Sequence, residues 1–380
     1  MDFVLSDEQR LLKESVARLF ADQYDFNARK NYREEPGGWS RKMWAKYADL
    51  GLLGLPFQEE YGGSGGGPVE TMVVMETLGR SLALEPYLAT VVLCGGLLRL
   101  GGSEAMRAGL LPKIASGDLV MAFAHAERQA RYDLADVVTT ARRDGDGYII
   151  DGNKTLVLHG DSAGKFIVSA RLSGGQRDRD GLGLFLIDAK APGVSVRGYP
   201  TVDGLRAAEL SLNGARSDAA IGDPGAAFPL IEQVVDAAMA ALCSEAVGAM
   251  AAMHELTVDY MKTRKQFGTP IGGFQVLQHR AADMLIALEQ ARSMAMLSAM
   301  TATDDNVRER RQAVSAAKVQ IGRSGRLIGQ HAIQIHGGIG MTMEASIGHY
   351  FKRVTMIDTM FGDADYHLGL LAESGGLVAA

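Results

Sequence analysis

The stretch IQIHGGIGM, residues 333–341, follows a long segment with helical periodicity and places three glycines close together after a histidine. Each glycine costs backbone entropy on folding, so a cluster of them needs a structural reason. Gly337 and Gly338 would let another molecule approach the main chain closely, and bare N–H groups there can face anionic oxygens. The stretch therefore predicts a helix end that binds an anion. The alternative is a helix end that packs on a neighbouring helix.

A second predicted helix end also contains closely spaced glycines. Residues 264–275, RKQFGTPIGGFQ, close a long apolar helical segment and contain three more glycines. Arg264 is a permanent cation that can fork onto phosphate oxygens, and Phe267 offers a flat apolar surface. Gln266 and Gln275 add amide hydrogen-bonding groups. The alternative interpretation is an ordinary helix end with a solvated arginine.

The period of the apolar residues divides the chain into three regions. Residues 1–119 show helical patterns, the first of which begins at Ser6 with a capping box completed by Gln9. Residues 120–224 form short β-rich segments separated by turns, which predicts a compact sandwich or barrel. Within them we expect the polar run 173–181 to be a mobile loop. Residues 225–380 return to long helices with many small residues, typical of an antiparallel bundle.

Composition argues against several classes of protein. The 380 residues carry a net charge of −6, so nothing draws the whole chain to nucleic acid. No uncharged apolar run of about 18 residues stands out as a membrane span, and the acidic start MDFVLSDEQ is unlike a signal peptide. Cys94 and Cys243 lie in apolar surroundings without metal-ligand spacing. We expect buried thiols, no metal and a cytoplasmic location.

Several segments, taken in order, resemble the acyl-CoA dehydrogenase flavoprotein family. They are LSDEQRLL (5–12), GLLGLPFQEEYGGSG (51–65), GYIIDGNK (147–154), TRKQFGTPIGGFQVLQH (263–279) and IQIHGGIGMTME (333–344). The resemblance implies an α+β fold with an N-terminal helical domain, a central β-sandwich or barrel domain and a C-terminal antiparallel four-helix bundle. It also implies FAD as cofactor, an acyl-CoA thioester as substrate and electron-transfer flavoprotein as electron acceptor.

The resemblance assigns a set of residues to the diphosphate and adenosine of a flavin that another subunit mainly holds. They are Arg264, Gln266, Phe267, Gln275, Gln334, Gly337 and Gly338. His336, in the same place, is interpreted as a packing or hydrogen-bonding group. The strand region departs from the family, because Leu156 stands where a tryptophan is expected and Leu158 where a hydroxyl should meet the flavin edge.

The catalytic base of the family also has no direct match. Its usual glutamate lies in a Tyr-Glu-Gly-Thr stretch, which we match to MFGDADYH with Gly362 at the glutamate. The family's alternative base position matches Ala238. Two nearby acids could compensate: Asp363, one residue away, and Glu245, about two helical turns after Ala238. The alternatives are a loop aspartate that binds local N–H groups and a glutamate paired inside the bundle.

These departures favour the small subunit of a heteromeric enzyme, resembling the pimeloyl-CoA and steroid side-chain types, in a heterotetramer with a larger, base-bearing subunit. A self-sufficient homotetramer using Asp363 or Glu245 is the second hypothesis, and a non-catalytic CoA-ester-binding scaffold is the third. Arg128 and Arg131 could meet a phosphate or an ω-carboxylate, or form surface ion pairs with Asp133 or Asp136. Dicarboxylyl, medium-chain and polycyclic acyl groups all remain open.

Overall fold

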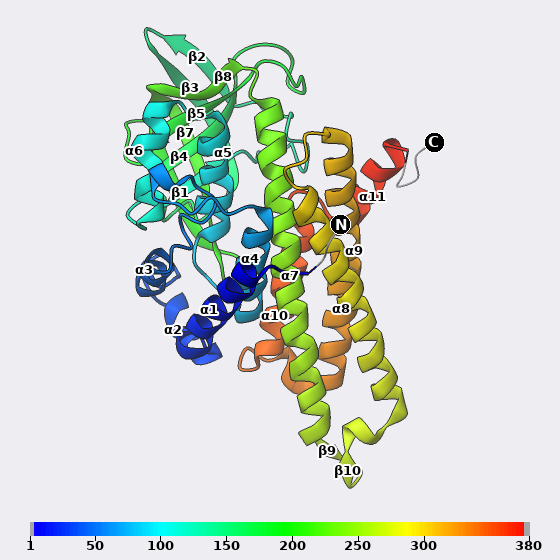
Figure 1. Cartoon of the computed structure of the whole chain (residues 1–380). Coiled ribbons are helices and arrows are strands. Elements are labelled where there is room, and N and C mark those ends of the chain that lie inside the picture. Colours follow the sequence, from blue (N-terminus) through cyan, green and yellow to red (C-terminus); the bar gives the residue numbers. More distant parts are fainter. Residues whose placement is uncertain (1–3, 376–380) are drawn as a thin grey trace. The chain divides into compact units, whose positions relative to one another are not determined.

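The computed structural model describes residues 4–375, which form two compact units (Figure 1). One unit comprises residues 1–31, 68–83 and 239–380, and the other comprises residues 32–67 and 84–238. These units cut across the three sequence regions, because the long helix that begins at Phe228 continues from one unit into the other. Each unit is therefore described by itself.

The first third of the chain is helical, as the sequence predicts. Its helices are α1 (Asp7–Gln23), α2 (Phe26–Arg33), α3 (Arg41–Asp49), α4 (Pro68–Ser81), α5 (Gly95–Gly101) and α6 (Glu104–Ala115), with a 3-10 turn at Glu59–Tyr61 and a π-helical turn at Leu88–Cys94. The predicted capping box is confirmed: Ser6 accepts from the N–H of Gln9, whose side chain accepts from the N–H of Ser6. Ser40 precedes α3, but its side chain makes no capping hydrogen bond.

The strand region forms one mixed sheet. Its strands are β1 (Met121–Ala124), β2 (Thr140–Asp144), β3 (Gly147–Leu158), β4 (Lys165–Arg171), β5 (Leu182–Asp188), β6 (Val194–Pro200), β7 (Arg206–Ser217) and β8 (Ala219–Gly225). The spatial order is β6-β7-β3-β2-β4-β5-β8, and β1 pairs with β4 in parallel. Alternate residues of these strands, including Ile150, Phe166 and Leu210, are fully buried in one apolar cluster.

The loop at residues 173–181 lies on the surface, as expected, because residues 173–180 are exposed, and a single buried arginine binds four of its carbonyl oxygens. The guanidinium of Arg171, at the end of β4, donates to the carbonyl oxygens of Ser173, Gln176, Asp178 and Asp180. Its Nε donates to another carbonyl outside the loop, and only 8% of the residue is exposed. A polar sequence pattern gives no sign of this arrangement, because the arginine that holds the loop lies on the preceding strand.

The C-terminal part is a bundle of long helices (Figure 1). They are α7 (Phe228–Thr263), α8 (Gln275–Thr301), α9 (Val307–His336), α10 (Ser346–Thr359) and α11 (Ala364–Glu373). A hairpin of β9 (Lys265–Gln266) and β10 (Thr269–Pro270) and a 3-10 turn at Ile271–Gly273 join α7 to α8, and a 3-10 turn at Gly337–Met341 follows α9. The fold class predicted from the sequence is confirmed.

One described helix, α7, is apolar and long enough to cross a membrane by length and composition, although it contains no uncharged run of 18 residues. Its best 18-residue window has a mean hydropathy of 1.5, but 94% of that window is buried within the protein. Cys94 and Cys243 are buried free thiols, as predicted. Burial raises the pKa of Cys243 to about 12, so its thiol is inert at neutral pH.

Small residues allow the close helix packing that the sequence suggested. A Cβ at Gly79 on α4 would overlap the carbonyl oxygen of Glu245, and one at Gly248 on α7 would overlap that of Glu76. The backbones of α4 and α7 therefore meet directly at these two glycines. No side chain can be inserted there without moving a helix.

We expect Gly79→Ala to lower the free energy of unfolding by about 2–3 kcal/mol, since the added methyl group must displace backbone. Gly109→Ala on α6 is the matched control, because nothing lies within 4 Å of its Cβ position. There the exchange should stabilise by about 0.5–1 kcal/mol. Urea unfolding of both variants measures the difference, and equal effects at the two sites would contradict the packing.

Candidate functional site

The hairpin between α7 and α8 presents an aromatic ring to solvent. Thr269 pairs with Gln266, so Phe267 and Gly268 are the two central residues of a tight turn. Both have positive φ, 54° and 79°, the combination that a type I′ turn requires. Phe267 is 93% exposed. A bulky residue held at positive φ with almost all of its surface in water indicates a contact surface for another molecule.

The other predicted residues of this strip flank the hairpin. Arg264 directly follows the last residue of α7, and Gln275 is the first residue of α8; both are exposed. The N–H of Ile271 donates to the carbonyl of Arg264 over 2.8 Å, which folds the loop back on the helix end. Gln266 is exposed on β9. The strip therefore offers a cation, amides and a ring on one short, fixed loop.

The second strip lies where α9 ends. Gln334, Gly337 and Gly338 are all exposed, and nothing lies within 4 Å of a Cβ built at either glycine. Gly337 has φ +64°, so the turn favours glycine there. The surface above both glycines is open to a ligand that touches the backbone.

One ring contact joins the two strips. Tyr260, in the last turns of α7, stacks on His336, the last residue of α9, with ring centroids 4.4 Å apart and an interplanar angle of 21°. The Nδ1 of His336 lies 2.8 Å from the carbonyl of Ala332, and burial lowers the pKa of the imidazole. His336 is thus a packing residue, as expected, and it places both glycine turns at the same end of the bundle.

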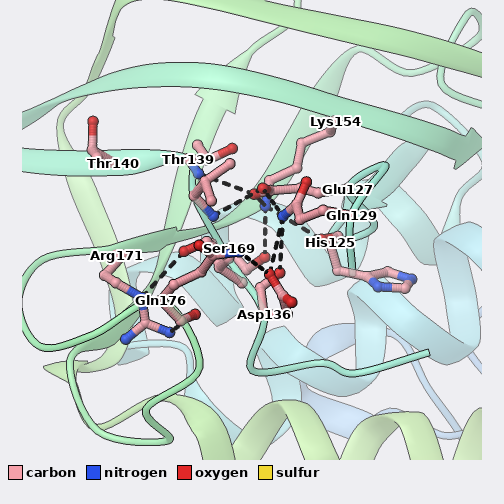
Figure 2. A network of polar contacts seen from close by, with 12 residues as sticks. His125, Glu127, Gln129, Asp136, Thr139, Thr140, Lys154, Ser169, Arg171 and Gln176 are labelled. Atoms are coloured by element: carbon pink, nitrogen blue, oxygen red, sulfur yellow. Dashed lines mark hydrogen bonds and ion pairs between the residues drawn. The ribbon is translucent and has the colours of Figure 1, made fainter. Parts of the chain in front are cut away.

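In the sheet domain, a buried ion pair links β3 to the segment that follows β1 (Figure 2). The ammonium of Lys154 on β3 lies 2.7 Å from Glu127, which follows β1, and donates to Ser169 on β4. The N–H of Thr155 donates to the carbonyl of Ala126 over 2.9 Å. The segments 122–130 and 155–163 therefore lie side by side.

Charge and burial set the ionisation of this pair. Burial lowers the pKa of Lys154 to about 8, although the carboxylate of Glu127 opposes this shift. Burial alone would raise the pKa of Glu127, but the ammonium and the hydrogen bonds to the carboxylate bring it below its usual value. The N–H groups of Val138 and Thr139 also donate to this carboxylate. Both groups are charged at neutral pH.

Leu156 lies at an irregularity in β3. The register of β3 against β7 shifts between Lys154 and Val157, and Leu156 has φ +50° with 41% of its surface exposed. Its backbone therefore displays the side chain outward, as the tryptophan expected there would be displayed. A leucine in this conformation offers less surface for a planar ring to stack on.

The two candidate bases are both engaged elsewhere. Glu245 on α7 is 5% exposed and makes a two-pronged ion pair with Arg353 on α10, at 2.5 and 2.8 Å. Asp363 is the N-cap of α11 and accepts from the N–H of Tyr366 over 2.9 Å. Ala238 is fully buried on α7. Each acid makes the structural interaction that was the alternative to a catalytic role.

The segment around Gly362 has an unusual backbone. Phe361 has φ +58° and Gly362 has φ +119°. A Cβ at Gly362 would lie 2.5 Å from Cδ1 of Tyr366 and 2.7 Å from Nε2 of His367. The imidazole of His367 is held between Ser315 on α9 and the carbonyl of Phe361. The position is therefore shaped for glycine.

Sequence reasoning missed the buried lysine that supports this segment. The ammonium of Lys318, in the middle of α9, donates to the carbonyls of Ile357, Asp358 and Met360 over 2.7–3.1 Å. These carbonyls lie at the C-terminal end of α10, where the helix dipole favours a cation. The available signal was a lysine inside the apolar pattern SAAKVQIG, which indicates a buried polar partner.

We expect Glu127→Gln to cost about 3 kcal/mol of stability, since it leaves the Lys154 ammonium buried without a counter-charge. Combining it with Lys154→Met should recover part of this loss. Asp188→Asn is the matched control, because its ion pair with Lys165 is 3.1 Å long but largely exposed. That control should cost less than about 1 kcal/mol. Equal losses in urea unfolding would show that burial does not strengthen the Glu127 pair.

The buried His367 should make the protein sensitive to acid. Burial, with the nearby Lys318 charge, lowers the pKa of His367 to about 3, whereas an unfolded histidine titrates near 6.5. The lowered pKa of His367 contributes fully to the free energy of unfolding above pH 6.5. This contribution is lost as the pH falls towards 3, because the unfolded chain then binds a proton that the folded chain does not. From pH 7 to pH 5 this amounts to about 2 kcal/mol.

His367→Gln should remove that part of the pH dependence, while the exposed His279→Gln should leave it unchanged. The measurement is the free energy of urea unfolding at pH 7 and pH 5 for the three proteins. A pH dependence in His367→Gln equal to that of the unmodified chain would refute the assignment.

Comparison with known proteins agrees with this arrangement over almost the whole chain. Family models described as acyl-CoA dehydrogenase N-terminal, middle and C-terminal domains match residues 6–118, 122–214 and 228–376. The probable acyl-CoA dehydrogenase YngJ of Bacillus subtilis is 28% identical over 96% of this chain and 97% of its own length.

Solved structures show the same likeness. A chain of the ChsE4–ChsE5 complex from Mycobacterium tuberculosis is 26% identical, with a TM-score of 0.90 over 100% of both chains. The FAD complex of PigA is 28% identical, with a TM-score of 0.90 over 99% of this chain and 100% of that one. The protein therefore belongs to the acyl-CoA dehydrogenase family, whose cofactor is FAD.

Proposed function

We propose that this chain is the base-deficient small subunit of a heteromeric acyl-CoA dehydrogenase. In this proposal it supplies the surface that holds the diphosphate and adenosine of an FAD shared with a larger subunit. The observation that carries the proposal is the exposed ring of Phe267, held at positive φ beside Arg264 and Gln275. A contact surface is intact, while the carboxylate that the chemistry needs is missing.

The residues of the two strips suit an adenine dinucleotide. Arg264 presents a guanidinium that can donate two parallel hydrogen bonds to phosphate oxygens. Phe267 offers a face for the adenine ring, and Gln275 and Gln334 offer donors and acceptors for its polar edge. Gly337 and Gly338 leave room for the diphosphate to touch the backbone. FAD, when bound, accepts the hydride that leaves the β-carbon of the acyl thioester.

The base-deficient role is supported by what surrounds each expected position. Removal of the α-proton needs a positioned base with a suitable pKa. Glu245 forms a buried ion pair with Arg353, and Asp363 is the N-cap of α11. If the glycine of the family's Tyr-Glu-Gly-Thr stretch is aligned with Gly362 instead, Phe361 takes the position of the glutamate. Either match leaves that position without a carboxylate.

A partner subunit with a base therefore completes the reaction in this proposal. The ChsE4–ChsE5 complex from Mycobacterium tuberculosis brings together two differently named chains, one of which shares the fold of this chain, and this supports a heteromeric arrangement here. Electron-transfer flavoprotein is the proposed electron acceptor and the cytoplasm the proposed location. The acyl group stays undefined among dicarboxylyl, medium-chain and polycyclic acids.

The test compares the chain purified alone with the chain co-expressed with a larger, base-bearing acyl-CoA dehydrogenase subunit from the same genome. Alone it should be pale and inactive; with the partner it should show flavin absorbance and reduce a dye with an acyl-CoA. Arg264→Gln and Phe267→Ala should each lower the FAD retained by the complex about tenfold. Val307→Ala, which also alters an exposed apolar residue of the bundle, is the control and should retain FAD normally.

Three other results would contradict the proposal. A yellow chain that oxidises acyl-CoA without a partner would establish the self-sufficient homotetramer. A chain that stays colourless and inert with every partner would establish the scaffold. FAD retention that is insensitive to both variants would remove the two strips from the cofactor site.

A further inference from the structure

In the segment between β1 and β2, the acidic side chains accept hydrogen bonds within the protein, whereas the two arginines are exposed. Residues 127–136, ERQARYDLAD, contain two arginines and three acids. All three carboxylates are engaged by the protein itself. Glu127 and Asp136 are only 3% and 1% exposed, and Asp133 accepts from the N–H of Ala135 over 2.9 Å. Glu127 and Asp136 are therefore held away from the two arginines of the same segment, and Asp133 makes no ion pair with either of them among the described residues.

The carboxylate of Asp136 accepts hydrogen bonds from the side chains around it (Figure 2). It accepts from the side chains of Gln129 at 3.2 Å, Gln176 at 2.6 Å and Arg177 at 2.8 Å. The sequence left open an ion pair between Asp136 and Arg128 or Arg131, but the structure gives this carboxylate to Arg177 instead. The amide of Gln129 also donates to Glu127, so Gln129 links the two buried carboxylates of the segment.

The guanidinium groups of Arg128 and Arg131 face outward. Both residues are exposed, and neither side chain makes a hydrogen bond or ion pair with any part of the chain between residues 4 and 375. The guanidinium of Arg131 lies over the ring of Tyr132, with its carbon atom Cζ 5.4 Å from the ring centroid. Each arginine therefore keeps its full set of donors.

The backbone fixes where these two side chains start. Ala130 donates its N–H to the carbonyl of Glu127 and Asp133 to that of Ala130, which makes two successive β-turns. Arg128 and Arg131 each occupy the first corner of their turn. Arg131 has φ +50°, a conformation that long side chains rarely adopt. An arginine in a conformation where glycine would be relaxed is strained, and such strain is a reason to look for a use of its side chain.

We propose that Arg128 and Arg131 bind phosphate oxygens of the coenzyme A part of the acyl-CoA. The assignment rests on the proposed function for its ligand, since an acyl-CoA carries both a diphosphate and a 3′-phosphate. Guanidinium groups match phosphate geometry by paired hydrogen bonds. Two unneutralised guanidiniums on consecutive fixed corners can receive a phosphate with little ordering of the backbone.

The test is calorimetric titration of the whole protein, with its partner subunit where one associates, by CoA, dephospho-CoA and pantetheine. The variants are Arg128→Gln and Arg131→Gly, the second of which also relieves the positive φ. Arg142→Gln on β2 is the control, because Arg142 is likewise exposed and makes no ion pair among the described residues. Thermal unfolding verifies that all variants are folded.

Each of the two variants should weaken CoA binding about tenfold and leave pantetheine binding unchanged, whereas the control should bind CoA normally. A loss that persists with dephospho-CoA assigns the diphosphate, and a loss confined to CoA assigns the 3′-phosphate. The proposal is overturned if both variants bind CoA with unchanged affinity, or if the Arg142→Gln control loses as much CoA affinity as they do. A dicarboxylyl-CoA is titrated as a fourth ligand, and a loss seen only with it assigns a carboxylate and also overturns the proposal.

The proposed function fails separately from this inference. If the unmodified protein binds no CoA at all, both are refuted. If it binds CoA and the two arginine variants bind it equally well, only the arginine assignment is refuted and the acyl-CoA dehydrogenase proposal stands.

Discussion

The stacked rings of Tyr260 and His336 are the contact on which the candidate nucleotide-binding surface depends. They join the last turns of α7 to the last residue of α9, so both glycine-punctuated helix ends lie at one end of the bundle. Burial keeps the imidazole neutral by lowering its pKa, and its bond to the Ala332 carbonyl fixes the ring.

Buried cations organise the rest of the molecule in a similar way. Lys154 holds β1, β3 and β4 together, Lys318 caps α10 from α9, and Arg171 ties down the loop that follows its own strand. A buried charge is costly unless it is paired or fully hydrogen-bonded, so each cation imposes the positions of its acceptors. The segments around the candidate sites are therefore more rigid than their polar sequences indicate.

The chain combines an exposed surface suited to a dinucleotide with expected base positions that carry no available carboxylate. The backbone near Gly362 is held by Lys318 and His367 although no acid is displayed there. Such a division is physically reasonable for one of two unlike subunits, because cofactor contacts and proton removal need not come from the same chain.

By itself, the sequence determined the fold class and the locations of both glycine-rich helix ends, because helical period, turn residues and the capping box at Ser6 are local properties of the chain. It could not determine the state of Glu245, the use of Asp136 or the tying of residues 173–181. Their partners, Arg353, Gln176 and Arg171, are set by how distant segments pack, and only the tertiary structure decides which donor reaches which acceptor. The same packing left Phe267 in water and turned Arg128 and Arg131 outward, since exposure is a property of the folded surface and of no local pattern.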